Sequence, residues 1–255
     1  MVRAINFSDE SNLLPQAELH SLVQDAIDRR LEFKDLQALA ERVTRYLKKH
    51  GWFLAHAYLP RQDVTAGDIE IVISAGKIDS SGKAFIPHLD ETSRIDPERL
   101  RKIAASAVSP GTAIHEDDLA RAVLLMNDLP GIDVRARFEP GSEKGSTSVH
   151  LDVKEGPLFN AITWLDNYGS HDTGTGQINS YFSLNDLSGR GDQISLMATH
   201  SEGIDLGHLS YMIPLGSDGL KLNLGFSAMA YTTLTQLGRV AGLEGQSQTA
   251  NISLG

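Results

Sequence analysis

Apolar and polar residues alternate along the second part of the chain. In GLKLNLGFSAMAY, residues 219–231, one side of an extended strand carries Leu220, Leu222, Leu224, Phe226, Ala228 and Ala230, and the other carries Lys221, Asn223, Ser227 and Tyr231. A soluble sheet packed on a core gives this pattern, and so does a membrane strand between lipid and water. The alternation alone leaves both structures open.

Beyond Gly156 the whole sequence follows this pattern. Runs of about ten residues, the length of a tilted membrane strand, are divided by Gly, Asn, Asp and Ser. We predict strands that begin near Phe159, Gln177, Gln193, Asp205 and Leu220, with a sixth opening near Thr249. Aromatic residues near strand ends of the apolar face favour a membrane barrel over a sandwich, and they are Trp164, Tyr168, Tyr211 and Tyr231.

The first part of the chain has helical periodicity instead. After a short strand, Pro15 is expected to open a helix. A second helix ends at Gly51 and has one apolar face, formed by Leu36, Leu39, Ala40, Val43 and Leu47. Two strands, WFLAHAYLP and DIEIVIS, are predicted to follow.

The same order of elements returns after about Lys83. Asp96 and Pro97 predict a helix start, and a later helix ends before Pro130. Gly51 and Gly131 are 80 residues apart, as are Gly76 and Gly156. We therefore predict an α+β part followed by an all-β part: β-α-α-β-β modules at residues 1–78 and 79–156, then strands over 157–255.

Composition narrows the possible functions. The chain has 33 acidic and 23 basic residues, so nucleic acid is not an expected partner. It has no cysteine, which excludes disulfides and thiolate metal sites. No run of about 18 apolar residues predicts a transmembrane helix, and the first ten residues do not resemble a signal peptide.

Candidate catalytic and metal motifs have simpler explanations. Glu116, Asp117 and Asp118 follow His115. Acidic residues at a helix start are stabilised by the helix dipole, so a metal is not needed to explain them. The glycine-rich stretch at 172–176 precedes no helix, as a phosphate loop would. The common hydrolase motifs are absent. We expect no enzymatic activity, cofactor or metal.

Three stretches resemble one protein family in the family's own order. Residues 36–78 are similar to the first POTRA domain of two-partner secretion transporters, through Gly51, Pro60, Gln62, Gly67 and Gly76. Residues 124–157 resemble the second POTRA domain, through Pro130, Gly131 and Gly145. The stretch LDNYGSHDTGTGQ resembles the first barrel strand and turn, through Asp166, Asn167, Tyr168, Gly169 and Gly174.

This resemblance is to the ShlB/FhaC/HecB-type haemolysin secretion/activation proteins of the Omp85 superfamily. It implies a 16-stranded barrel in the outer membrane, with lipid around the part beyond residue 157 and POTRA domains in the periplasm. The implied partner is a secreted exoprotein, captured by its N-terminal secretion domain and exported unfolded without ATP. A barrel-assembly factor of the same superfamily and a non-transporting POTRA binding fragment are the alternatives.

The edge strands of the modules are the predicted capture sites. An unpaired strand edge can accept an extended client by β-augmentation. The expected edges are 53–59 and 132–138, with contact residues Phe53, Ala55, His56, Tyr58, Ile132, Val134, Arg135 and Arg137. The alternative is that these are ordinary solvated strand faces.

The chain also departs from the family pattern. It lacks the signal peptide, the N-terminal plug helix and the arginine-containing loop motif of the family, and five or six strands cannot close a barrel. We therefore expect a fragment of a transporter that does not transport alone. Its apolar side, with Leu222, Leu224 and Phe226, is expected to face lipid, and Lys221, Asn223 and Ser227 to face a pore. The part beyond Gly156 is expected to aggregate without detergent.

Overall fold

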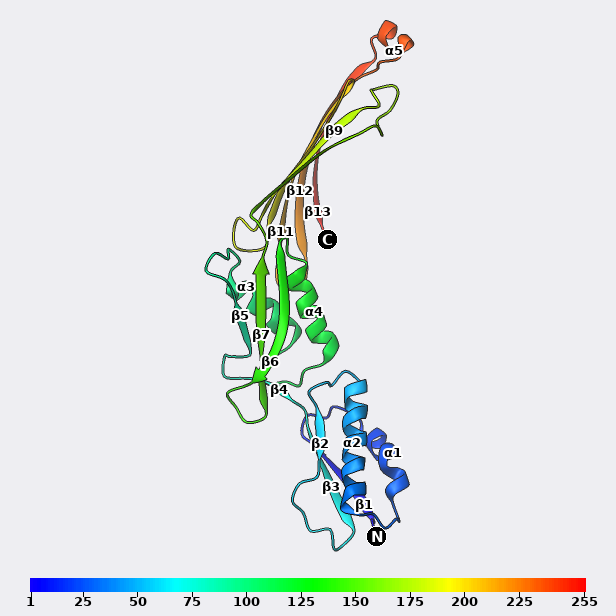
Figure 1. Cartoon of the computed structure of the whole chain (residues 1–255), viewed down its shortest axis with the longest axis vertical. Helices are drawn as coiled ribbons and strands as arrows, with labels where there is room; N and C mark the ends of the chain where they lie inside the picture. Colours follow the sequence, from blue (N-terminus) through cyan, green and yellow to red (C-terminus); the bar gives the residue numbers. More distant parts are fainter. The chain divides into compact units, whose positions relative to one another are not determined.

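The computed structural model describes all 255 residues, which form two compact units (Figure 1). The first unit contains Met1–His88, Ala104–Leu124 and Ala136–Asp152. The second contains Leu89–Ile103, Leu125–Arg135 and Val153–Gly255. The predicted order, helices with short sheets followed by strands, is confirmed.

The first sheet has three strands and two covering helices. The elements are β1 (Ala4–Asp9), α1 (Gln16–Val23), the 3-10 turn η1 (Gln24–Ala26), α2 (Phe33–Lys49), β2 (His56–Tyr58) and β3 (Asp68–Ser74). β3 lies in the middle, parallel to β1 and antiparallel to β2. Both helices lie on one face of this sheet in Figure 1, where they close the core of the sheet.

Helix α2 forms where its sequence pattern predicts it. Its start is closed by a capping box, in which Glu32 and Asp35 each accept the backbone N–H of the other. The predicted inward face is confirmed by the buried residues Leu36, Leu39, Ala40, Val43 and Leu47. The helix therefore supplies both the core stripe and a rigid support beside β2.

The strand predicted at WFLAHAYLP is shorter than expected. β2 contains only His56–Tyr58, and Phe53 and Ala55 lie outside it. Ala55 N–H donates to the Trp52 carbonyl at 3.0 Å, which closes a turn before the strand. Pro60 has no N–H to continue the ladder after it.

The second module repeats the first with one strand added. Its elements are β4 (Lys77–Ile78), β5 (Phe85–His88), α3 (Pro97–Ala107), α4 (Glu116–Asn127), β6 (Ile132–Pro140) and β7 (Ser146–Glu155). β7 is central: β4 and β5 run parallel to it, and β6 pairs with it. The predicted helix start is confirmed, since the Asp96 carboxylate accepts the Glu98 N–H at 2.9 Å.

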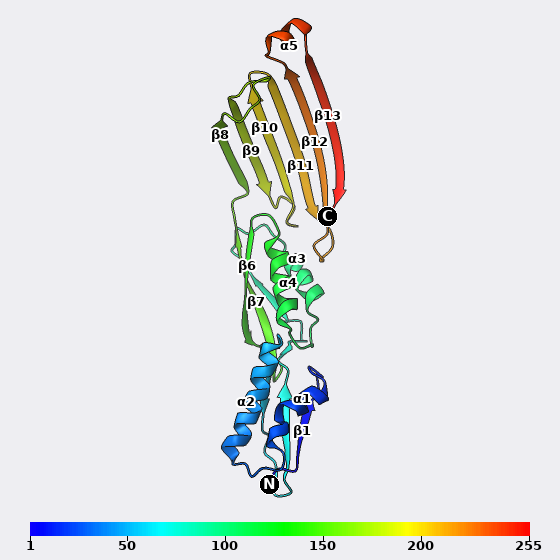
Figure 2. The same cartoon turned by 90° about the vertical axis from the view of Figure 1, so that its right-hand side faces the viewer.

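Six antiparallel strands follow in chain order (Figure 2). They are β8 (Phe159–Asp166), β9 (Gln177–Asn185), β10 (Gln193–Ser201), β11 (Ile204–Pro214), β12 (Lys221–Thr232) and β13 (Glu244–Leu254). The prediction for the sixth strand was wrong, because it begins at Glu244 after a short helix, α5 (Gln236–Ala241). No helix in the structure has the length and apolar character needed to cross a bilayer.

The strand register gives this sheet one apolar and one polar face. Two adjacent cross-strand rows are almost wholly apolar: Phe159, Leu184, Ile194, Tyr211, Leu224 and Ile252 form one, and Ala161, Phe182, Leu196, Leu209, Phe226 and Ala250 form the other. On the opposite face a row is formed by Asn160, Ser183, Ser195, Ser210, Gly225 and Asn251. We call these the apolar face and the polar face.

The predicted aromatic girdle of the apolar face is only partly correct. Tyr211 is in an apolar row, but Trp164 is paired with Asn179, and Tyr231 follows Ser227 on the same side of β12. Both of these aromatic residues therefore belong to the polar face, because side chains two positions apart share a side. Tyr168 lies in the turn after β8 and is 90% exposed.

A buried carboxylate anchors the start of the second module within the first unit. Asp79 is fully buried and accepts hydrogen bonds from the N–H groups of Ser81 and Ser142 at 2.8 and 2.5 Å. The hydroxyls of Ser81, Ser142 and Ser146 donate to it at 2.5, 2.6 and 3.3 Å. The hydrogen bond from Ser142 has the largest effect on Asp79 and that from Ser81 the next largest, and together they hold the pKa of Asp79 well below its ordinary value.

We predict that Asp79→Asn destabilises the chain at pH 7, because an amide cannot accept all of these bonds. A carboxyl whose folded-state pKa is depressed contributes stability that is complete above its unfolded pKa of about 3.9 and is lost as pH falls through the folded value. The difference in thermal unfolding between the native chain and Asp79→Asn should therefore shrink below about pH 4. Asp68→Asn, a change at an exposed carboxyl, is the control, and an equal effect of both variants would contradict the role of Asp79.

Candidate partner-binding edges

The outer edge of β2 is closed by a helix side chain. In an antiparallel pair, successive residues direct their N–H and C=O groups to opposite sides. Ala57 N–H donates to Thr44 Oγ1 at 2.8 Å, and the Thr44 hydroxyl lies 3.4 Å from the Ala57 carbonyl oxygen. The backbone N–H and C=O groups of Ala57 therefore point away from β3, and the Thr44 hydroxyl on α2 occupies the position that a further strand would take.

The motif residues Pro60 and Gln62 close the same edge beyond β2. Tyr58 is opposite Val72, so continued register places Pro60 opposite Glu70. Gln62 Nε2 donates to the Glu70 carbonyl at 2.7 Å, and Glu70 N–H donates to Gln62 Oε1 at 2.7 Å. The Gln62 amide thus replaces a strand residue where proline has no N–H to offer.

The first half of the β6 edge is closed in the same way. Val134 N–H donates to Asn127 Oδ1 at 2.5 Å, and Asn127 Nδ2 donates to the Val134 carbonyl at 3.2 Å. Ile132 N–H is bound by the Leu129 carbonyl at 3.1 Å. These two residues therefore direct their backbone groups away from β7. Sequence reasoning missed Asn127, whose only signal was an amide residue at a helix end shortly before a strand.

The second half of β6 has an open edge. Alternation from Val134 directs the N–H and C=O groups of Ala136 and Phe138 outward as well. Pro140 ends the strand without an N–H. The segment Ala136–Phe138, which we call the open edge, can therefore accept two pairs of strand hydrogen bonds.

The predicted contact residues differ in what they present. The side chains of Ala55, Ile132 and Val134 are buried in the core and present no surface. His56 and Tyr58 are exposed, and their rings lie 5.9 Å apart. A residue not predicted as a contact, Phe138 at the end of the open edge, packs its ring 5.1 Å from that of Phe53 and is 39% exposed.

The two predicted arginines are not equivalent. Arg137 donates to both carboxylate oxygens of Asp152, one of them at 2.9 Å, and pairs with Glu139 at 3.0 Å. The Asp152 bonds, with Glu139 adding, raise the pKa of Arg137, and Arg137 in turn lowers the pKa of Asp152. Arg135 is exposed and reaches only Asp133, at 4.0 Å. Arg135 is therefore the freer charge beside the open edge.

The residues that carry the family resemblance lie mainly at turns. Several glycines have positive φ, which side chains rarely adopt: Gly51, Gly67, Gly76, Gly131, Gly145 and Gly174. Asp166 holds the turn after β8, since it accepts Tyr168 N–H at 3.1 Å and Asn179 Nδ2 at 2.8 Å. Asn167 is exposed in this turn, and Gly169 N–H donates to the Thr175 carbonyl at 3.0 Å. Pro130 lies with Gly131 before β6.

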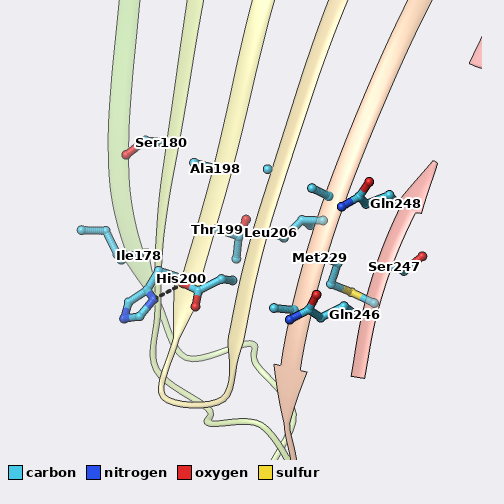
Figure 3. A pocket seen from close by; sticks show the side chains of 14 residues that line it. Ile178, Ser180, Ala198, Thr199, His200, Leu206, Met229, Gln246, Ser247 and Gln248 are labelled. Carbon is cyan, nitrogen blue, oxygen red and sulfur yellow. Dashed lines mark hydrogen bonds and ion pairs between the residues drawn. The ribbon is translucent and has the colours of Figure 1, made fainter. Parts of the chain in front are cut away.

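A hollow of about 570 Å³ lies on the six-stranded sheet (Figure 3). Its floor includes a row of small residues of the apolar face, Ser180, Ala198, Gly207 and Ala228. His200 and Asp205 at its margin are paired with each other at 2.6 Å. No group of three or more metal-binding side chains is present in the chain. The hollow therefore arises from small side chains among larger ones.

Comparison with protein families matches both parts of the chain. Residues 1–76 match the ShlB-type POTRA domain. Residues 145–255 match the haemolysin secretion/activation protein family ShlB/FhaC/HecB. The two matches include the closed β2 edge and the six-stranded sheet.

Two transporters are similar to this chain over most of its length. The heme/hemopexin transporter protein HuxB of Haemophilus influenzae (strain 86-028NP) is 21% identical over 92% of this chain and 40% of its own length. The outer membrane transporter CdiB of Dickeya dadantii (strain 3937) is 26% identical over 89% of this chain and 37% of its own length. The chain thus spans about two fifths of the length of these relatives.

Two solved structures share the fold of this chain. CdiB from Escherichia coli matches 99% of this chain and 46% of its own, with a TM-score of 0.76 and 22% identity. BamA from Haemophilus ducreyi, lacking POTRA domains 1–3, matches 99% of this chain and 46% of its own, with a TM-score of 0.56 and 14% identity. The chain is therefore similar to the ShlB-type POTRA domain over residues 1–76 and to the haemolysin secretion/activation proteins ShlB/FhaC/HecB over residues 145–255.

Proposed function

We propose that this chain is the client-capturing part and the first barrel strands of a two-partner secretion transporter. Residues 1–78 and 79–156 act as periplasmic POTRA domains, and 157–255 as barrel strands in the outer membrane. The client is a secreted exoprotein, captured through its N-terminal secretion domain and exported unfolded without ATP. The open edge on β6 is the observation that carries this proposal.

Strand addition needs backbone groups without partners. A client strand gains affinity from main-chain hydrogen bonds and selectivity from alternate side chains. Thr44 and Gln62 already satisfy the edge at β2, whereas Ala136 and Phe138 direct unsatisfied groups outward from β6. Of the two predicted edges, we therefore assign capture to β6, with the Phe53–Phe138 ring pair as a contact for an apolar client residue.

The apolar face supports a membrane position for the six strands. Two full rows of it are apolar, and Leu209 and Phe226 are 48% and 47% exposed, so they have no core to enter. The outermost strands, β8 and β13, each have one unpaired edge. Unsatisfied backbone groups in hydrocarbon cost several kcal/mol each, so the proposal requires further strands to close the barrel, 16 in all by the family resemblance.

A barrel-assembly factor is the second candidate function, and the fold shared with BamA favours it. Such a factor would bind many unfolded outer-membrane proteins. A secretion transporter would select one exoprotein. Binding of this chain to an unrelated urea-unfolded outer-membrane protein as tightly as to the exoprotein domain would favour the assembly factor.

We predict that Ala136→Pro weakens client binding by about twofold to tenfold, because it removes one outward N–H, and one hydrogen bond contributes about 0.5–1.5 kcal/mol. Proline is tolerated at an edge position whose N–H faces solvent, so the pairing with β7 should survive. The measurement is binding of the full chain, in detergent micelles, to the immobilised N-terminal domain of the secreted protein encoded beside it.

Arg135→Ala is the matched control for this binding experiment, since it alters the same strand and keeps all backbone groups. Its effect on affinity should be small and should depend on salt. If the Ala136→Pro variant binds the immobilised domain as tightly as the unmodified chain does, capture at the open edge is contradicted.

We also predict that a lysine on the apolar face weakens membrane association. Leu209→Lys should lower partition of the full chain into phosphatidylcholine vesicles about 30-fold or more, because a lysine near the bilayer centre costs about 2–4 kcal/mol. Ser210→Lys places the same charge on the polar face of the same strand and should change partition little. Equal losses for the two variants in vesicle co-sedimentation would contradict the assignment of faces.

A further inference from the structure

The turn between β9 and β10, residues Asp186–Asp192, is held together by two buried aspartates. Asp186 is fully buried and Asp192 is 2% exposed. Asp186 Oδ1 accepts Gly191 N–H at 2.6 Å. Asp192 accepts the N–H and the hydroxyl of Ser188 at 2.9 and 2.7 Å, and the Tyr211 hydroxyl at 3.2 Å. The turn is therefore an ordered element with carboxylates inside it.

The same turn packs closely on segments of the second unit that precede the six strands. Gly189 accepts the Asp96 N–H on its carbonyl at 2.9 Å. A Cβ at Gly189 would lie 2.9 Å from the Arg94 carbonyl oxygen, and a Cβ at Gly191 would lie 2.8 Å from Leu129 Cδ2. Both glycines have positive φ, so only glycine suits these contacts without strain. The packing of this turn is specific.

An ion pair organises the segment that receives the turn. Glu155, at the end of β7, has 5% of its side chain exposed and accepts Arg94 N–H at 2.7 Å. The Arg94 guanidinium lies 2.5 Å from Glu155 Oε1 and donates to the Gly156 carbonyl at 3.1 Å. One terminal nitrogen of the Arg94 guanidinium thus binds both Glu155 and Gly156, and its buried Nε has no hydrogen-bond partner. Neither nitrogen is hydrogen-bonded to the buried carboxylates of the turn.

Two carboxyls in this cluster, Asp186 and Glu155, have a buried oxygen without a hydrogen-bond partner, and Glu155 Oε1 is ion-paired with Arg94 whereas Asp186 Oδ2 has no ion pair. Glu155 at the end of β7 and Asp192 in the turn repel a charge on Asp186, and Arg94 in the segment before α3 attracts it. Burial, with these two carboxylates adding, raises the pKa of Asp186. Although burial opposes it, the bonds from Ser188 lower the pKa of Asp192, which stays ionised.

Two further arginines lie near the cluster without relieving it. Arg99 on α3 has a buried Nε atom without a partner, and burial together with the charge of Arg190 in the turn lowers the pKa of Arg99. These cations repel each other and are not among the groups hydrogen-bonded to Asp186. A proton is therefore the simplest partner for Asp186 Oδ2.

We propose that the Asp186–Asp192 turn and the Arg94–Asp96 segment form an acid-stabilised joint, which is closed when Asp186 is protonated and loosens when Asp186 ionises. The joint involves the end of β7 and the turn between β9 and β10, so it sets how firmly the β9–β10 hairpin is held to the segment before α3. A group with a raised folded-state pKa stabilises the closed joint fully below its ordinary pKa of about 3.9 and loses this effect as pH rises through the raised value.

Distance measurements on the full chain test this joint, and the absence of cysteine allows selective labelling. Spin labels on Glu91→Cys and Leu187→Cys, both exposed positions of the second unit, report the separation of the segment from the turn. In detergent micelles between pH 4 and pH 8, we expect one narrow distance at low pH and a broader distribution at high pH. The change should span about two pH units, because each unit alters the ratio of protonated to ionised carboxyl about tenfold.

Asp186→Asn separates this mechanism from other titrating groups. An amide keeps the acceptor for Gly191 N–H, tolerates the positive φ of 53° and has no charge, so the distance should stay narrow at every pH. Asp218→Asn changes a carboxyl in the exposed β11–β12 turn, and its distance distribution should broaden with rising pH as in the parent chain. A parent distribution that does not change with pH would overturn the proposal, as would the same pH-dependent broadening in Asp186→Asn.

Discussion

The requirement that every strand N–H and C=O group finds a partner governs this chain. Each small sheet has edges, and helix side chains satisfy part of them: Thr44 on α2 binds Ala57, and Asn127 on α4 binds Val134. Where proline interrupts the ladder, the Gln62 amide takes over. These contacts protect the modules against indiscriminate strand pairing and leave a short open edge on β6. The same requirement explains why six strands with two free edges need further strands in a membrane.

Periodicity predicted the elements well wherever a single face is buried. The apolar stripe from Leu36 to Leu47 predicted α2, and the alternation of apolar and polar residues predicted five of the six long strands close to their observed starts. The sixth start was missed because α5 has no buried apolar stripe: Leu237 and Val240 are 79% and 85% exposed. Trp164 was placed on the wrong face because its position near a strand end was considered without its register.

The candidate site was harder to predict than the fold, since edge closure depends on contacts between distant residues. Thr44 and Ala57 are 13 positions apart, and neither is unusual in the sequence. The predicted contacts Ile132 and Val134 lie on the correct strand, but their side chains point into the core and their backbone N–H groups are already bound. Only alternation counted from Val134 identifies Ala136 and Phe138 as the open positions. The pairing of Arg137 with Asp152 likewise depends on the placement of β6 beside β7.

Amide hydrogen exchange of the full chain, resolved to single residues with and without the exoprotein domain, tests the central claim most directly. In the free chain the amides of Ala57 and Val134 should exchange slowly because side chains hold them, and those of Ala136 and Phe138 should exchange fast. Binding of the domain should slow exchange at Ala136 and Phe138 and leave Ala57 unchanged. Fast exchange at Ala136 and Phe138 in a complex that has formed would contradict capture at this edge.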